Sequence, residues 1–94
     1  MYIKYQGFDT APSFRLYTFH VINPPFEPRE FTVKVQLEAF GPNRLSLQDG
    51  PGICYARLGE ALQGQTPQSP ADPCLIIGER DITDYLEHHH PKKG

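Results

Sequence analysis

The chain closes with "DYLEHHHPKKG", where three consecutive histidines stand beside two lysines. Imidazole is a common metal ligand, so His88, His89 and His90 are the first candidates for a metal site. Successive residues of a helix are turned by ~100°, so the three rings would splay around the axis and not grip one ion. We therefore expect only adventitious divalent metal at these histidines, which together with the lysines complement the negative end of a helix dipole.

Asp84 and His88 are four residues apart and would share one face of a helix. They could supply two metal ligands, but zinc sites normally need three or four, and the only other histidine in the chain is His20. A solvated His88, with His89 against the edge of the core, is the simpler interpretation.

Cys54 is the one candidate nucleophile. It follows "DGPG" in the first turn of an expected helix, where free backbone amides and the helix dipole lower the pKa of a thiol, and a histidine brought near by folding would act as base. Cys54 also begins an apolar stripe shared with Leu58, Ala61 and Leu62. A thiol in apolar surroundings has a raised pKa and is inert, so we favour the core role.

No other pattern forms a catalytic motif. "GPG" is too short for a phosphate loop and lacks the following lysine, and no serine stands in a G-x-S-x-G setting. Asp81, Asp84 and Glu87 are spaced as acidic residues at a helix amino terminus are, without any need for catalysis. We expect no enzyme activity and no cofactor.

Charge and composition narrow the class of partner. The net charge is −2 with histidine neutral, and only Lys92 and Lys93 stand together, whereas nucleic-acid binding needs a concentrated basic excess. No apolar run approaches the ~20 residues that span a bilayer, and the amino terminus does not resemble a signal peptide, which predicts a cytoplasmic protein. Cys54 and Cys74 are then expected to be free thiols, buried as small apolar groups.

The apolar patterns predict strands over residues 2–8, 14–22, 31–40 and 44–48. Residues 31–40 alternate strictly, so one face of that strand is core and the other is wet. Residues 14–22 are apolar on both faces. This indicates that other elements of the domain cover both faces, or that one face contacts another subunit. The three prolines in residues 23–30 predict a stiff, extended connection.

The period then changes to that of a helix at residues 51–63, followed by a short buried strand at 74–77 and a second helix at 82–89, capped by "DITD". The expected fold is an α+β domain of order β-β-β-β-α-β-α, a mostly antiparallel four- to five-stranded sheet with two helices packed on one face. One domain spans residues 1–94, with a short flexible tail from about residue 90.

The remaining unusual feature of the sequence is the placement of its aromatic side chains. Aromatic residues on a two-sided strand and in a proline-stiffened loop favour a protein interface at Tyr17, Phe19 and Phe26. We therefore expect a small cytoplasmic module that acts by binding a protein partner or a second copy of itself. The alternative is a nucleic-acid-associated regulator that uses the outer sheet face, with Arg15, Lys34, Arg44 and the lysine tail, aided by tyrosines that stack on bases.

Overall fold

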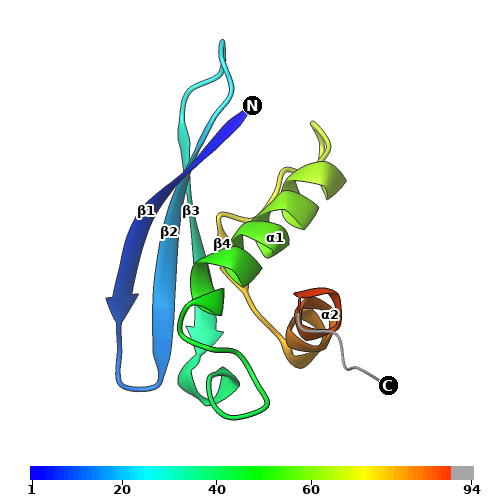
Figure 1. Ribbon diagram of the computed structural model, residues 1–94. Coiled ribbons are helices and arrows are strands. Elements are labelled where there is room, and N and C mark those ends of the chain that lie inside the picture. The colour runs from blue at the N-terminus through cyan, green and yellow to red at the C-terminus, as the bar shows by residue number, and fades with distance from the viewer. Residues whose placement is uncertain (90–94) are drawn as a thin grey trace.

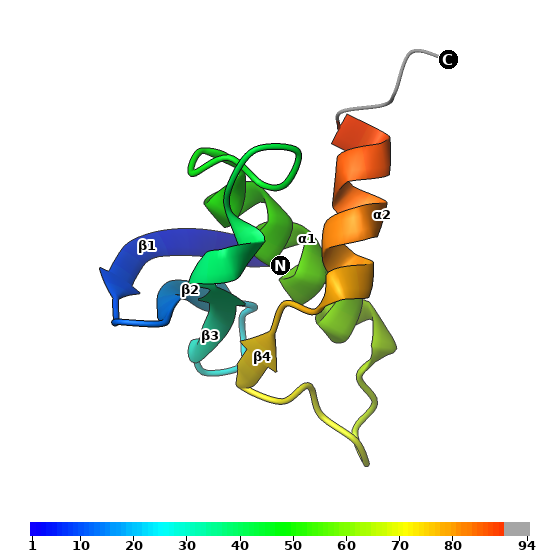
Figure 2. The same ribbon diagram turned by 90° about the horizontal axis from the view of Figure 1, so that it is seen from below.

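A four-stranded mixed sheet carries two helices on one of its faces (Figure 1). The computed structural model describes residues 1–89. Along the chain the elements are β1 (Tyr2–Thr10), β2 (Phe14–Ile22), β3 (Arg29–Gln36), the 3-10 turn η1 (Leu37–Ala39), α1 (Asp49–Gly64), β4 (Cys74–Ile76) and α2 (Glu79–His89). The spatial order is β1-β2-β3-β4, with β1, β2 and β3 antiparallel and β4 parallel to β3. Figure 2 shows both helices on the same side of the sheet. The predicted α+β class is confirmed.

The predicted order is kept, but its fourth β segment is reduced to one bridge. β3 ends at Gln36, where the chain tightens into η1, so the strand expected over residues 31–40 is shorter at its end. Residues 44–48 then form no strand: Leu45 makes an isolated bridge with Phe40 and fills the core with its fully buried side chain. The free edge of β3 is taken by β4, since the Thr32 amide donates to the Pro73 carbonyl (2.8 Å) and the Ile77 amide donates to the Lys34 carbonyl (2.9 Å).

A bulge in β1 changes which side chains face the helices. The register with β2 shifts between Tyr5 and Gly7, so Gln6 is an extra residue, and Gly7 has a φ of 123° that favours glycine. Strict alternation would send Phe8 to the opposite face from Tyr5. Because of the bulge, both lie on the helix-bearing face.

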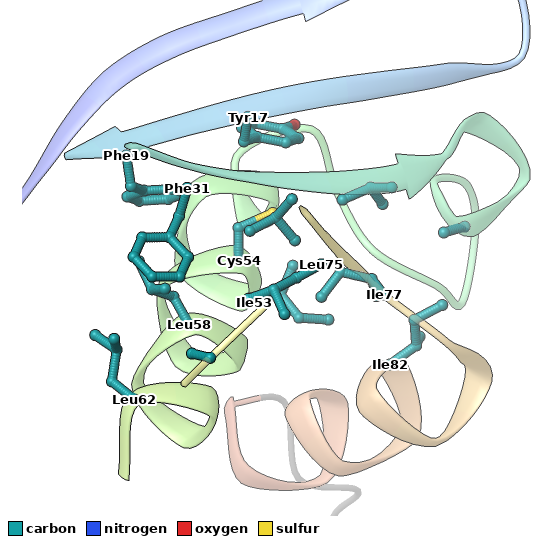
Figure 3. Close-up of a cluster of buried hydrophobic side chains, with 14 of the residues drawn as sticks. Tyr17, Phe19, Phe31, Ile53, Cys54, Leu58, Leu62, Leu75, Ile77 and Ile82 are labelled. Carbon is teal, nitrogen blue, oxygen red and sulfur yellow. The ribbon is translucent and has the colours of Figure 1, made fainter. Parts of the chain in front are cut away.

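The core fills the space between the sheet and the helices (Figure 3). From the sheet come Tyr17, Phe19, Phe31, Val33 and Val35, all at most 1% exposed, and α1 adds its predicted stripe with Ile53 and Cys54. Burying side chains of this size contributes roughly 1.5–3 kcal/mol each, so this single cluster is the main stabilising feature of the fold.

Both helices begin earlier than predicted because acidic side chains reach back to satisfy backbone donors. The Asp49 carboxylate accepts from the backbone amide (2.9 Å) and the hydroxyl (3.0 Å) of Ser46, and α1 starts at Asp49 rather than residue 51. In the same way Asp81 accepts from the Gly78 amide at 2.9 Å, so α2 starts at Glu79 and the cap expected in "DITD" lies inside the helix. The tail expected from about residue 90 lies outside the described residues.

Candidate interaction surface

The candidate nucleophile Cys54 lies in the core. Its side chain is fully buried on α1, and this burial raises the pKa of the thiol far above its ordinary value. His20 lies on the opposite face of the sheet, where its Nε2 is 3.3 Å from the Glu30 carboxylate. The structure therefore does not bring this imidazole to the thiol, and the core role expected for Cys54 is confirmed.

Cys74 departs from the prediction that both thiols are buried. Both are free, but Cys74 is exposed. It lies on the outward side of β4, an edge strand, and the alternation of side chains turns only Leu75 toward the core. Exposure of the second thiol thus follows from its register.

His88 is the histidine of α2 whose side chain the structure describes, and it forms a hydrogen bond within its own helix. Nδ1–H of His88 donates to the backbone carbonyl of Asp84 at 2.7 Å, which fixes the ring tautomer without using the Asp84 carboxylate. A groove of about 280 Å³ between α1 and α2 is lined by Arg57, Glu60, Asp81, Asp84, Tyr85 and His88, among other residues. Within residues 1–89 no three ligating side chains converge as a metal site would require. The side chains of His89 and His90 lie outside the described part.

The cations expected to bind nucleic acid are dispersed. Arg15 lies on the helix-bearing face with its guanidinium 4.4 Å from the Phe8 ring centroid, whereas Lys34 lies on the opposite face. Arg44 follows η1 and is paired with Glu79 at 2.7 Å. Lys92 and Lys93 lie outside the described residues. The three cations that the structure describes form no common basic stripe.

The three residues favoured as an interface divide into two groups. Tyr17 and Phe19 are 0% and 1% exposed, because α1 covers the face of β2 that carries them, so these two are corrected to core residues of a single chain. Phe26 is 70% exposed. Its loop is a turn rather than an extended connection, since the Phe26 amide donates to the Asn23 carbonyl at 3.0 Å.

Phe26 borders a hollow of about 430 Å³ between the β2–β3 loop and the loop that follows α1. Arg29 ties these loops together: its guanidinium donates to the Gln65 side-chain carbonyl (3.0 Å) and to the Ala71 backbone carbonyl (3.1 Å). Both guanidinium hydrogen bonds join parts of the fold, so Arg29 is a structural residue.

The sheet face opposite the helices, here called the outer face, is uncovered by the described residues. Its side chains are set by the strand register and alternate with the core residues. They are Tyr2, Lys4 and Asp9 on β1, Phe14, Leu16, Thr18, His20 and Ile22 on β2, Glu30, Thr32, Lys34 and Gln36 on β3, and Cys74 and Ile76 on β4. Tyr2 and Ile76 are each 59% exposed. This face is thus a broad surface of mixed apolar and charged character.

Register places the charged side chains of the outer face in two rows across the strands. Lys4, His20 and Glu30 are direct neighbours in one row. Asp9, Leu16 and Lys34 are neighbours in another, and between them runs a row through Thr18, Thr32 and Cys74.

Comparison with known proteins found no match: no family model, no curated protein and no solved structure matches the chain. Within residues 1–89 the longer helix, α1, is neither long nor apolar enough to cross a bilayer, and the same holds for α2.

Proposed function

We propose that the chain is a non-catalytic cytoplasmic module that binds protein through its outer face. The observation that carries the proposal is the central strand β2: Tyr17, Phe19 and Val21 on its helix-bearing face are buried, while its other face presents Phe14, Leu16 and Ile22 with no described element over them (Figure 1). Apolar side chains flanked by charges are typical of protein interfaces.

The chemistry of the face supports a protein partner. Its apolar residues are spread over three strands and are interrupted by both signs of charge, a mixture that favours a polar-rimmed protein surface. Lys34 holds its ammonium 4.3 Å from the Phe14 ring centroid and so covers part of that ring. The two free thiols support a reducing compartment.

The proposed binding site is the outer face and not a free edge of the sheet. β1 has a free edge, but it bears Lys4 and a bulge, two features that disfavour pairing of one edge strand with another. β4 is only three residues long. Neither edge offers a long, flat row of backbone groups, whereas the outer face of β2 and β3 does offer continuous side-chain surface.

A photo-reactive amino acid in place of Thr18, at the centre of the outer face, tests the proposal. Irradiation of cells that naturally express the chain should yield a protein adduct from Thr18. The matched control carries the same group in place of Gln63, an exposed residue on α1. Equal adducts from both positions, or none from Thr18, would contradict the proposal.

A further inference from the structure

The outer face carries four Lys, Asp or Glu side chains, which stand at the corners of a rectangle and alternate in sign from corner to corner. Lys4 on β1 and Glu30 on β3 share one row, and Asp9 on β1 and Lys34 on β3 share the other. The rows lie symmetrically on either side of Thr18, two residues away along β2 in each direction. Between residues 1 and 89, Lys4 and Asp9 have no ion-pair partner.

Such a pattern is complementary to itself. Consider a two-fold axis that lies between the outer faces of two copies and runs perpendicular to the strands. It places each strand over the same strand of the second copy and exchanges the two charged rows. Lys4 then opposes Asp9 of the second copy, and Glu30 opposes Lys34 of the second copy, so opposite signs meet at all four corners. Isologous contacts of this kind are the commonest way in which identical chains associate.

We propose, on the basis of the function proposed above, that the outer face binds a second copy of this chain, with the two sheets face to face and the two-fold axis along the row through Thr18, Thr32 and Cys74. Sheets that pack in this aligned manner cross at about 30°, a rotation that long lysine side chains accommodate. The helices of both copies then lie on the outside of the pair.

The apolar residues agree with the same axis. Exchange of the two ends of β2 lays Phe14 over Ile22 of the second copy, and Ile22 over Phe14. Leu16 lies over His20, whose imidazole has an apolar body. The axis that maintains charge complementarity therefore also superposes the large apolar side chains at both ends of the central strand.

The size of the face is sufficient for a reversible pair. Strands of nine, nine, eight and three residues, with ~3.3 Å per residue and ~4.8 Å between strands, give a projected footprint of roughly 460 Å². The accessible surface of the side chains is larger than their projection. The face is smaller than the ~800 Å² that each partner contributes to a standard interface and fits a weak, reversible pair.

The axis gives the exposed thiol a distinctive position. Cys74 pairs with Thr32 and lies in the central row, so in the dimer it faces Cys74 of the second copy. With ~10 Å between packed sheets, the two sulfur atoms are close enough for a short bis-maleimide. An axis parallel to the strands would match the charges as well, but it would place the two thiols on opposite sides of the interface.

Sedimentation equilibrium of the full chain tests the pairing by charge reversal. Wild type should dimerise, and Lys4→Glu should weaken the dimer by roughly tenfold or more because like charges then oppose each other. Arg80→Glu, an equal change in net charge on exposed Arg80 of α2, should leave the dimer unchanged. The double variant Lys4→Glu with Asp9→Lys should regain wild-type affinity, whereas Lys4→Glu with Glu30→Lys should not.

Cross-linking with a short bis-maleimide supplies the second measurement. Wild type should give covalent dimer through Cys74, and a variant with Cys74→Ser and Gln63→Cys should give far less. A monomer at all concentrations, restoration by Glu30→Lys in place of Asp9→Lys, or equal cross-linking from residue 63 would overturn the pairing. A monomer whose residue 18 still cross-links to a different protein would overturn this inference and leave the proposed function standing.

Discussion

Gly50, in the first turn of α1, lies directly against the hydroxyl of Tyr17 from β2. A side-chain carbon at Gly50 would overlap this hydroxyl and lie 2.6 Å from the ring carbon that bears it. Tyr17 is completely buried. The glycine therefore sets how closely α1 approaches the sheet.

Gly50→Ala is expected to lower the free energy of unfolding by about 1–3 kcal/mol, the usual cost of overpacking a core. The matched control is Gly59→Ala in the same helix, where an added carbon meets nothing within 4 Å. That change should raise stability by about 0.5–1 kcal/mol, because alanine loses less backbone entropy in a helix than glycine. Urea denaturation measures both, and equal effects of the two substitutions would contradict the close approach.

Gly7→Ala should also be destabilising, for a backbone reason. The φ of 123° is rarely adopted by residues with a side chain, although an added carbon at Gly7 would meet no neighbour. We expect a loss of about 1–3 kcal/mol. Gln6→Ala, an exposed change at the same bulge, should cost little in the same thermal or urea titration. A neutral Gly7→Ala would show that the bulge is absent.

The two thiols should differ sharply in their reaction with iodoacetamide. Native protein, diluted below the concentration at which it pairs, should take up one equivalent at Cys74, which is exposed in the single chain; buried Cys54 should react only in denaturant, because it is inaccessible and its pKa is raised by burial. Mass spectrometry of peptides assigns the sites. Rapid native alkylation of Cys54 would return it to consideration as a nucleophile.

Stability should fall in alkaline solution partly through Cys54. Burial raises its pKa above the ordinary value of 9.0, so the folded state keeps the proton over a range in which the unfolded chain loses it. The contribution is intact below pH 9.0 and is lost as pH rises further, at about 1.4 kcal/mol per pH unit. Urea titrations at pH 9 and pH 10 should show a smaller decline for Cys54→Ala than for wild type; identical declines would refute this linkage.

Periodicity in the sequence predicted the elements that fold on local patterns. The strict alternation of Phe31, Val33 and Val35 correctly assigned the core face of β3, and the stripe that begins at Cys54 correctly assigned the buried side of α1. These patterns are readable because a single face of each element is apolar.

Elements decided by tertiary contacts were harder to predict. The bulge at Gly7 depends on pairing with β2, and the early start of α2 depends on Asp81 reaching back to Gly78. The exposure of Cys74 depends on β4 being an edge strand beside β3. None of these relationships has a periodic signature in a single sequence.

The predicted interface residues Tyr17 and Phe19 lie on the side of β2 that the core buries. Because both faces of β2 are apolar, composition does not distinguish Tyr17 and Phe19 from Phe14 and Leu16. The register with β3 does, since Tyr17 lies opposite Val33 and Phe19 opposite Phe31 on the core side. The rows of alternating charge on the outer face emerge only when this register is known.

A dilution series followed by amide chemical shifts tests most directly whether the outer face is the association surface. From about micromolar to about millimolar protein, we expect concentration-dependent shifts centred on Leu16, Thr18 and Thr32, with α1 unchanged. Shifts confined to the groove between α1 and α2, or no shifts at any concentration together with no adduct from residue 18, would contradict it.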